Sequence, residues 1–388
     1  MVSTCSARVG GHRMLVWCSL MLTVVFVLIA LANVLAAPRL SKSKKLSLGK
    51  QPFVSVLVPA RNEAHQISAC IGSLLANQYS DFEVIVGDDQ STDGTGAVVA
   101  AMINERAAAL GPTLKLLTIN QPPPLGWTGK ARTCQELANQ ARGEILVFCD
   151  ADVNAAPEAL AGTVALLNGY RADTLSALPR QLGGSALVQA LVAVVTQFSI
   201  LISLPLMVIP RSKNPSLATG NGQWMAWRRS AYLEIGGHEA VRTSRIEDVA
   251  LARLVKEQGL TLIVALATRE LTVRMYESLA AARLGFRKNL FALLGDSWVA
   301  ACASLVTTVA LLLAPILALA TGSLEAGVAL LSLNLVLLLA QRLAFRTPWS
   351  ALVRLPLGIV VAMVVLCESV VYSRRGVLVW KDRSLVVE

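Results

Sequence analysis

Long apolar runs dominate the pattern of hydrophobic and polar positions along the chain. Four of them are nearly free of charge: 14–37, 299–320, 326–340 and 355–372. A helix needs about 20 apolar residues to cross the hydrocarbon core of a bilayer, and the third run is the shortest of the four. We expect four membrane-spanning helices, of which the first anchors the chain behind an N-terminal tail of residues 1–13.

The first run has two interpretations. Arg8 and Arg13 precede it and Ala36 and Ala37 follow it, as in a secretory signal. The apolar core of a signal has only about 7 to 15 residues, so the longer run here favours an uncleaved anchor. A linker, 38–51, follows with the basic residues Arg39, Lys42, Lys44, Lys45 and Lys50. Basic residues flank membrane helices on the cytoplasmic side, so we expect the linker and the domain after it to be cytoplasmic.

Residues 52–296 have the pattern of a globular domain, in which short apolar runs alternate with runs at helical spacing. Ile67, Cys70, Ile71 and Leu74 lie on one face of an expected helix that Asn62 would cap. The expected strands are 53–59, 82–89, 114–119 and 144–150, and two further helices are expected at 95–110 and 129–141. Strands that alternate with helices predict an α/β fold, with a mostly parallel sheet covered by helices on both faces.

One more apolar run, 185–210, lies inside this domain. If it crossed the membrane, Asp152 and Asp248 would lie on opposite sides of the bilayer. We therefore expect a helix that lies in the membrane interface, with Gln189 and Gln197 on its wet face.

Charge and cysteine content limit the classes of partner. The 35 basic and 25 acidic residues give a net charge of +10, and the basic cluster beside the first run suits anionic lipid headgroups. No nucleic-acid-binding motif accompanies it, so we expect no nucleic acid partner. The 7 cysteines have no zinc-type spacing and indicate a reducing compartment.

Polar motifs follow three of the expected strands: "VPARNE" at 58–63, "GDDQSTDGT" at 87–95 and "DAD" at 150–152. Turn chemistry explains any one of them. Three at one sheet edge favour a binding site, because ligands of such sheets bind beyond the carboxyl ends of the strands. Asp150 and Asp152 offer oxygen ligands to Mg²⁺ or Mn²⁺, which bind through one or two carboxylates plus substrate phosphates.

These motifs, in this order and together with "RIEDVALA" at 245–252, resemble the signature series of glycosyltransferase family 2, whose members have the GT-A fold. "PLGWTGKA", "RRSAYLEIGGH", "RMY" and "GFRKNLFA" are similar to its membrane-anchored bacterial subgroup of carotenoid, hopanoid-associated and ceramide-type enzymes. The resemblance covers 52–290. It implies a multi-pass protein of the inner (plasma) membrane that moves one sugar from a nucleotide-sugar donor to a lipid or carotenoid hydroxyl, with inversion.

The resemblance also implies roles for individual residues. The residues matched to donor binding are Pro59, Arg61, Glu63, Asp88, Asp89, Lys130 and Asp150. Asp150 and Asp152 match the metal-binding motif, and Asp248 matches the catalytic base. A helix that starts beside Asp248 would favour the ionised carboxylate. His238 and the loop 218–227 would lie on the acceptor side, although a lone histidine is often structural.

One motif of the resembled family is missing. Polymer-forming relatives and ceramide glucosyltransferases carry a QxxRW-type motif after the base, and none follows Asp248. Arg283, Arg287 and Lys288 would replace its charge or meet lipid headgroups. The absence favours a single-sugar transferase over a processive synthase. A polyprenyl-phosphate sugar synthase and a non-catalytic nucleotide-binding membrane protein remain alternatives.

The basic tail, 373–388, conflicts with four spans. After membrane helices over 297–372 it would lie outside, yet its basic residues favour the cytoplasm. We expect a cytoplasmic tail, which requires that the short third run does not span.

Overall fold

A computed structural model describes residues 2–41, 51–106, 111–375, 378–380 and 383–385. The chain divides into two compact units. The helical unit consists of Met1–Ala36, Gly184–Pro205 and Tyr276–Arg375. The sheet unit consists of Ala37–Gly183, Leu206–Met275 and Gly376–Glu388.

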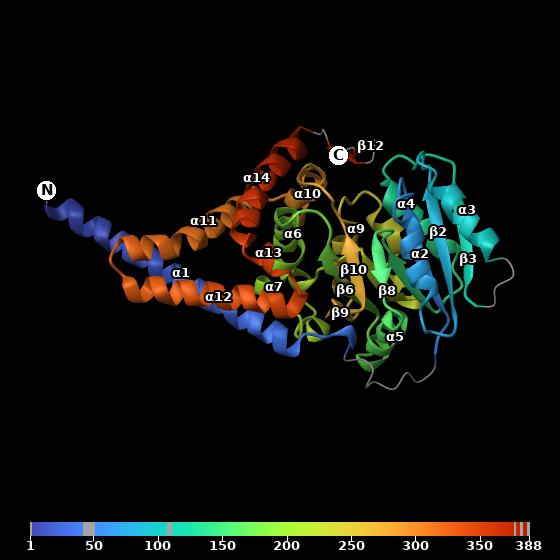
Figure 1. Ribbon diagram of the computed structural model, residues 1–388, viewed down its shortest axis with the longest axis horizontal. Coiled ribbons are helices and arrows are strands. Elements are labelled where there is room, and N and C mark those ends of the chain that lie inside the picture. The colour runs from blue at the N-terminus through green and yellow to red at the C-terminus, as the bar shows by residue number, and fades with distance from the viewer. Residues whose placement is uncertain (1, 42–50, 107–110, 376–377, 381–382, 386–388) are drawn as a thin grey trace. The chain divides into compact units, whose positions relative to one another are not determined.

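The sheet unit contains a seven-stranded sheet with the order β3-β2-β1-β4-β8-β6-β9 (Figure 1). Its strands are β1 (Val54–Ala60), β2 (Phe82–Asp89), β3 (Thr113–Ile119), β4 (Ile145–Cys149), β6 (Thr174–Leu178), β8 (Trp224–Arg228) and β9 (Leu262–Leu266). β1 to β4 are parallel, whereas β8 runs antiparallel to both β4 and β6. A smaller sheet joins β5 (Val153–Ala155), β10 (Leu271–Arg274) and β7 (Arg180–Leu182).

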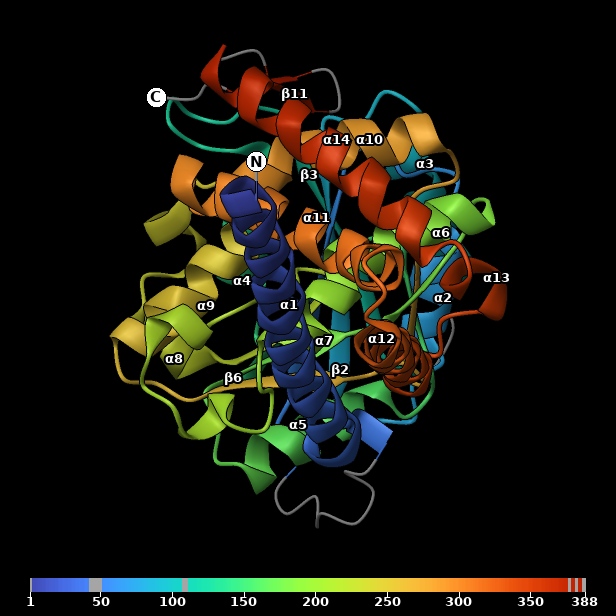
Figure 2. The same ribbon diagram turned by 90° about the vertical axis from the view of Figure 1, so that its left-hand side faces the viewer.

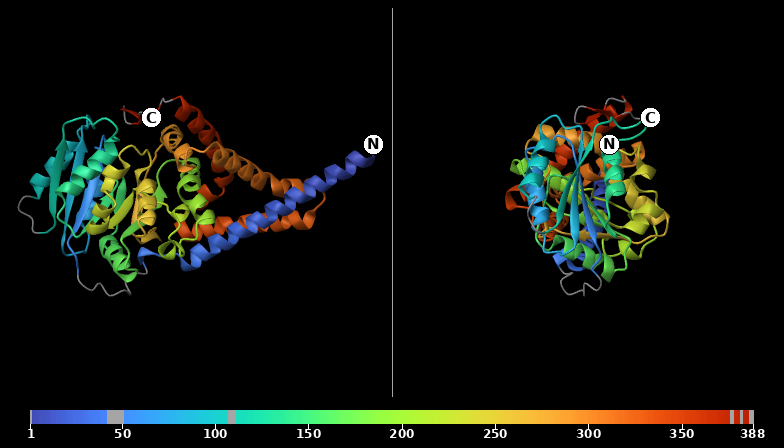
Figure 3. Two further views of the ribbon diagram at one scale, coloured as in Figure 1. Left: turned by 180° about the vertical axis from the view of Figure 1, so that it is seen from behind. Right: turned by 90° about the vertical axis from the view of Figure 1, so that its right-hand side faces the viewer.

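Helices lie on both faces of the large sheet, as the sequence pattern predicted (Figure 3). They include α2 (Ile67–Leu75), α3 (Thr95–Glu105), α4 (Gly129–Gln140), α5 (Ala159–Gly169), α8 (Arg229–Glu234) and α9 (Glu247–Glu257). β1, β2 and β4 are buried along almost their whole length, since both of their faces are covered. The expected α/β class is therefore confirmed. α3 is shorter than the expected helix, and residues 107–110 lie outside the described part of the chain.

Asn62 is not the N-cap that the sequence predicted. α2 begins at Ile67 behind Gln66, which makes no capping bond. Asn62 has a φ of 53°, a left-handed conformation that asparagine tolerates better than most residues. Its side-chain oxygen accepts from the Thr92 N–H at 2.9 Å, and its own N–H donates to Ser91 Oγ at 3.0 Å. Asn62 thus ties the loop after β1 to the loop after β2.

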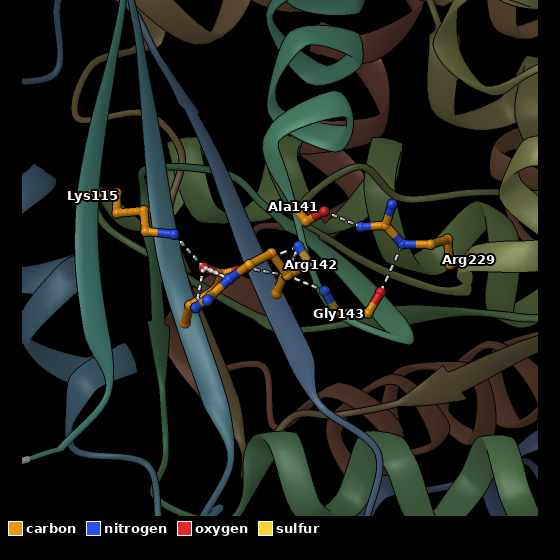
Figure 4. A network of polar contacts seen from close by, with 7 residues as sticks. Lys115, Ala141, Arg142, Gly143 and Arg229 are labelled. Carbon is orange, nitrogen blue, oxygen red and sulfur yellow. Dashed lines mark hydrogen bonds and ion pairs between the residues drawn. The ribbon is translucent and has the colours of Figure 1, made fainter.

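A buried carboxylate, Glu83, lies at the edge of the sheet where β1 and β2 begin. Two residues that bind it, Lys115 and Arg142, are labelled in Figure 4. Glu83 accepts hydrogen bonds from Ser55 Oγ at 2.8 Å, Lys115 Nζ at 2.8 Å and the Arg142 N–H at 3.0 Å. Burial alone would raise the pKa of Glu83, but these donors outweigh it and hold the pKa below its usual value. On the other side of the same turn, Arg229 donates to the carbonyl oxygen of Gly143 at 2.8 Å. The network fixes the turn between α4 and β4.

The helical unit contains two groups of helices. α1 (Val2–Ala36), α11 (Trp298–Ala320) and α12 (Leu324–Phe345) pack together in one group (Figure 2). α14 (Leu355–Arg374) packs against α10 (Leu279–Leu293) and α6 (Ala186–Ala193) in the other. Behind α6 the chain continues through a π-helical turn, Val194–Phe198, into α7 (Ser199–Ser203), and the short α13 (Trp349–Leu352) precedes α14.

Within the described residues, five helical segments are long and apolar enough to cross a membrane, one more than the sequence predicted. The third expected run is not short: α12 has 22 residues, because its helix continues through Gln341 and Arg342. The Gln341 amide donates to Gln197 Oε1 at 3.1 Å and to Thr347 Oγ1 at 3.0 Å, which satisfies its donors inside the unit. The reason given above for a cytoplasmic tail, a third run that fails to span, therefore does not hold.

The fifth segment, Ala186–Ser203, lies in the run for which an interfacial helix was expected. Gln197 is not on a wet face, because it is buried and its amide oxygen accepts from Gln341. It ends at Ser203 rather than at 210, because Leu204 before Pro205 is extended (φ −117°, ψ 117°), as residues before proline usually are. The strands on either side of it in the chain pair directly, with Thr174 of β6 opposite Trp227 of β8. A single crossing would separate these strands, so we propose that the segment stays on one side of the bilayer.

α14 follows α6 and α10 along its length. A Cβ atom at Gly358 would lie 2.8 Å from the carbonyl carbon of Ala190 in α6. Toward the other end, Glu368 pairs with Arg283 of α10, and Arg287 lies 3.9 Å over the Tyr372 ring. With 15 residues and several cations, α10 is too short and too polar to cross a bilayer. We propose that α14 remains with α6 and α10 on one side and that only α1, α11 and α12 span.

The first prediction concerns Glu83. Glu83→Gln should lower the free energy of unfolding by about 1 to 3 kcal/mol, because the amide cannot accept from all the buried donors around it. Since folding lowers the pKa of Glu83, its contribution is present above pH ~4.3 and is lost as the pH falls through the folded pKa. Thermal unfolding between pH 7 and pH 3.5 measures both effects. The exposed Glu105→Gln is the matched control, and equal losses in the two variants would contradict the prediction.

The second prediction concerns the tail. With three spans the C-terminus lies on the same side as the sheet unit, in agreement with its basic residues. Alkaline phosphatase fused after Glu388 should therefore be inactive, and green fluorescent protein fused there should fluoresce. An active phosphatase fusion would show that α14 crosses the membrane.

Candidate active site at the carboxyl ends of the central strands

A pocket in the sheet unit lies where β4 ends and β8 begins. Its walls include Phe148, Met225 and Leu251 on the apolar side. The polar side chains in its walls are Lys130, Asp150, His238, Glu247 and Asp248. The antiparallel pairing of β8 with β4 creates this site, because it places the residues before Trp224 beside the residues after Cys149.

Two helix starts bring their side chains to the same place. α4 begins after Thr128, whose hydroxyl caps it by accepting from the Ala131 N–H at 3.3 Å, and its first turn carries Lys130. α9 begins at Glu247, followed by Asp248. A turn of the loop before β8 closes against α9, where a Cβ atom on Gly220 would lie 2.3 Å from the Asp248 carbonyl oxygen. Only glycine permits that approach.

Lys130 connects two carboxylates from different elements. Its ammonium nitrogen lies 2.9 Å from Asp150 Oδ1 and 3.0 Å from Glu247 Oε1. Burial acts to lower the pKa of Lys130, but Asp150 and Glu247 raise it well above its usual value, so the side chain is charged. Burial acts to raise the pKa of Glu247, yet Lys130 outweighs it and the pKa is lowered. The pKa of Asp150 is raised by burial, with Lys130 opposing the shift.

Asp248 is held by backbone donors on both carboxylate oxygens. Oδ2 accepts from the Gly222 N–H and Oδ1 from the Val249 N–H, each at 2.8 Å. Nevertheless, burial and the neighbouring Glu247 raise the pKa of Asp248 to about 6. The sequence predicted that the helix start would favour the ionised carboxylate of Asp248. Loss of hydration and the like charge of Glu247 destabilise that ionised form by more than the helix terminus stabilises it.

Asp152 lies two residues beyond Asp150 and has a different environment. Among the described residues its Oδ1 atom has no hydrogen-bond partner although it is buried. Burial, Asp150 and Glu63 together raise the pKa of Asp152 to about 7. A buried carboxylate oxygen with no donor nearby fits a position where a cation binds. Within the described part of the chain no three acidic, histidine or cysteine side chains form a complete metal site, so further ligands would come from a substrate.

The remaining predicted donor-binding residues gather at the ends of β1 and β2. Arg61 donates to the Asp89 carbonyl oxygen at 2.7 Å, which links the two strand ends. The Glu63 N–H donates to Thr95 Oγ1 at 2.8 Å, and Asp88 Oδ1 accepts from the Ser91 N–H at 3.2 Å. Four of the predicted site residues line the pocket: Pro59, Lys130, Asp150 and Asp248. The residues at the neighbouring sheet edge are Arg61, Glu63, Asp88 and Asp89.

The residues expected on the acceptor side lie partly in the pocket wall. His238 lines the pocket, and the segment 218–227, whose last part belongs to β8, contributes Gly222 and Met225. Trp224 and Trp227 are fully buried, and the Trp224 indole donates to Thr163 Oγ1 at 3.0 Å. Glu247 is a pocket residue that the sequence reasoning did not select. Its position beside Asp248 in "RIED" could have identified it. An acidic residue at that position is, however, equally well explained by helix capping.

The chain is similar in sequence to known glycosyltransferases. A glycosyltransferase from Staphylococcus aureus, 4,4'-diaponeurosporenoate glycosyltransferase, is 25% identical over 287 residues, which cover 71% of this chain and 70% of that protein. Beta-monoglucosyldiacylglycerol synthase of a Nostoc species is 33% identical over 147 residues, 37% of this chain. An uncharacterised protein of Mycobacterium tuberculosis is 32% identical over 110 residues, 28% of this chain. The chain spans only 29% and 31% of the lengths of these last two.

The fold has a solved counterpart. A mannosyltransferase from Pyrobaculum calidifontis superimposes with a TM-score of 0.55 and 20% identity, covering 90% of this chain and 98% of that one. This likeness confirms the predicted GT-A fold. Residues 15–375 match the family model of glycosyl transferase family 21. The resemblance had suggested family 2, which is a different model and stays unconfirmed. The chain belongs to glycosyl transferase family 21.

Proposed function

We propose that this protein transfers a single sugar, a hexose, from a nucleotide-sugar donor to a hydroxyl group of a membrane lipid or carotenoid. The observation that carries the proposal is the pocket that combines Asp248, a carboxylate with a pKa of about 6, with Lys130 and Asp150. Asp152, two residues beyond Asp150, carries the buried carboxylate oxygen that has no hydrogen-bond partner in the described residues. The family match supports the transferase activity, and the names of the Staphylococcus and Nostoc relatives support this class of acceptor. The apolar helices support a membrane location.

Donor binding follows from the charges at the strand ends. A diphosphate is strongly anionic, so it needs cations at the carboxyl edge of the sheet. Lys130 supplies one, and Asp150 and Asp152 fit a Mg²⁺ or Mn²⁺ ion because Asp152 Oδ1 is buried without a donor in the described residues. When bound, the ion would neutralise charge on the leaving diphosphate. Arg61, Glu63, Asp88 and Asp89 would receive the nucleoside at the neighbouring strand ends.

Asp248 would act as the general base. Above pH 6 its carboxylate is largely ionised, and the raised pKa makes it a better proton acceptor than an exposed aspartate. It takes the proton of the acceptor hydroxyl while the hydroxyl oxygen bonds to the anomeric carbon and the bond from that carbon to the diphosphate breaks. Attack from the face opposite the leaving group inverts the configuration. The Gly222 and Val249 N–H groups keep the carboxylate oriented.

The location of the reaction follows from the anchor. We propose that the protein resides in the inner (plasma) membrane with the sheet unit in the cytoplasm, because the basic linker that follows α1 favours that side. Nucleotide sugars are soluble, whereas the acceptor is dissolved in the bilayer. The reaction therefore needs an enzyme that remains at the membrane surface.

The third prediction concerns Asp248. Membranes that contain the protein should transfer label from one member of a panel of nucleotide sugars to a lipid, with a rate that rises through pH 6 as Asp248 ionises. Asp248→Asn should lower kcat about 10²- to 10⁴-fold, the usual contribution of a general base, while donor binding barely changes.

The mass of the labelled lipid separates the alternatives. A product that contains a sugar phosphate ester would indicate a polyprenyl-phosphate sugar synthase. Donor binding without any product over the whole panel would indicate a non-catalytic protein. If Asp248→Asn abolishes donor binding instead of turnover, Asp248 is not the base.

The fourth prediction concerns Asp152. Because folding raises the pKa of Asp152 to about 7, the protonated form is favoured in the folded state and stability is lost as the pH rises from ~4 to 7. Asp152→Asn should therefore raise the Tm at pH 8 and have less effect at pH 5. Mn²⁺ should raise the Tm of the wild type but not of the variant, and the variant should be inactive.

The control for Asp152→Asn is Asp81→Asn at an exposed carboxylate. It should leave the Tm, the response to Mn²⁺ and the activity unchanged. Full activity of the wild type in EDTA would remove the metal from the proposal.

A further inference from the structure

His238 is a buried pocket residue to which the proposed mechanism gives no role. Its side chain lies in the pocket wall, with its ring 4.7 Å from the Phe148 ring, centroid to centroid. Burial lowers its pKa to about 4, so the imidazole is neutral at physiological pH. The groups that act on its charge are Glu247 and Lys130, the same side chains that surround Asp248. His238 therefore faces the reacting part of the pocket as an uncharged ring.

Tyr232 holds the other edge of this ring. Its hydroxyl oxygen accepts from the His238 backbone N–H at 3.1 Å and lies 2.8 Å from Nδ1. It also lies 3.3 Å from Gln135 Oε1. That amide oxygen is identified by its own partners, because it accepts from the Glu239 N–H at 3.1 Å while Gln135 Nε2 donates to Asn139 Oδ1 at 3.2 Å.

Counting protons along this network assigns the tautomer of His238. Tyr232 has one proton to donate and two acceptors within reach. If Nδ1 carries a proton, it donates to Tyr232, the Tyr232 proton goes to Gln135 Oε1, and every contact contains one hydrogen. If Nε2 carried it, the Tyr232 proton would go to Nδ1, and the Tyr232 and Gln135 oxygens would face each other at 3.3 Å without a hydrogen between them. The network thus places the proton on Nδ1.

We infer that His238 presents the lone pair of Nε2 to the pocket as an uncharged acceptor for a substrate hydroxyl, and that Tyr232 and Gln135 are positioning residues that fix this tautomer. In the described residues, no side chain or backbone group forms a hydrogen bond with Nε2 of His238. Nε2 is also not one of the fully buried polar atoms that lack a hydrogen-bond partner. A second acceptor beside Asp248 is useful because substrate hydroxyls that do not react also need partners for their protons. That the hydroxyl belongs to a sugar donor or to a lipid alcohol rests on the proposed function.

The tautomer can be measured without any activity. The chain has 3 histidines, so ¹⁵N-labelled histidine gives few signals, and loss of one in His238→Phe identifies His238. NMR that correlates ring nitrogens with carbon-bound ring protons should show a protonated Nδ1 and an unprotonated Nε2 at pH 7.5. A proton on Nε2 would overturn the inference, whether or not the protein transfers sugar.

Kinetics test the hydroxyl contact. His238→Phe and Tyr232→Phe should each lower kcat/KM about three- to tenfold, the effect of one hydrogen bond, with the Tm of Tyr232→Phe lowered no more than that of the control. Tyr79→Phe is the matched control, because the buried Tyr79 hydroxyl donates to the Pro52 carbonyl oxygen at 2.6 Å at the start of β1, away from the pocket. A rise in KM for the nucleotide sugar assigns the hydroxyl to the donor, and a rise in KM for the lipid assigns it to the acceptor.

Gln135 provides a second pair of variants on a less buried side chain. Gln135→Glu keeps an acceptor oxygen for Tyr232 and should keep kcat/KM, whereas Gln135→Met should reproduce the loss in Tyr232→Phe. Equal losses in Tyr232→Phe and Tyr79→Phe would show a structural role only and overturn the inference. If no sugar is transferred to any lipid but Nδ1 carries the proton, the proposed function fails and the tautomer assignment stands.

Discussion

The pair of contacts that Lys130 makes with Asp150 and Glu247 determines the properties of the rest of the site. Four carboxylates, those of Asp150, Asp152, Glu247 and Asp248, lie close enough to influence one another, and Lys130 neutralises only part of their charge. Glu247 gains most from it, since its pKa falls while the others rise. The two carboxylates that Lys130 does not touch keep high pKa values. The charge that Lys130 leaves unneutralised makes Asp248 more basic and gives Asp152 an affinity for a cation.

The strands that carry this charge imbalance are tied together at their other ends by hydrogen bonds. At the opposite edge, Glu83 joins the starts of β1 and β2 to the turn between α4 and β4. The same turn leads into the strand that ends at Asp150. Glu83, whose carboxylate accepts several hydrogen bonds, therefore supports the start of β4. The carboxylates that follow the other end of β4, those of Asp150 and Asp152, are less well supplied with donors. Mounting a charged site on a fixed strand limits the movement by which the like charges could separate.

Local patterns in the sequence were enough to predict β1 to β4, their parallel arrangement and the polar motifs beyond the ends of β1, β2 and β4. They did not predict β6, β8 and β9 or the antiparallel direction of β8. What they missed depended on partners distant in the chain. Asn62 caps no helix because Thr92, from another loop, binds its side chain. The pKa of Asp248 rises chiefly because the fold buries it beside the loop before β8, which no local pattern shows. α12 continues past Gln341, whose amide N–H groups donate to Gln197 and Thr347, residues that no helical pattern pairs with it.

The chain leaves the sheet unit after Gly183 and returns at Leu206, and this excursion constrains how an acceptor dissolved in lipid can be used. Both flanking segments must return to one sheet, so the intervening apolar helix cannot cross the bilayer once. An apolar helix that cannot cross still gains free energy by burying its surface in the interface. With the proposed interfacial placement, this segment would hold the protein at the depth where a lipid hydroxyl is found, while the soluble donor needs only the carboxyl ends of the strands.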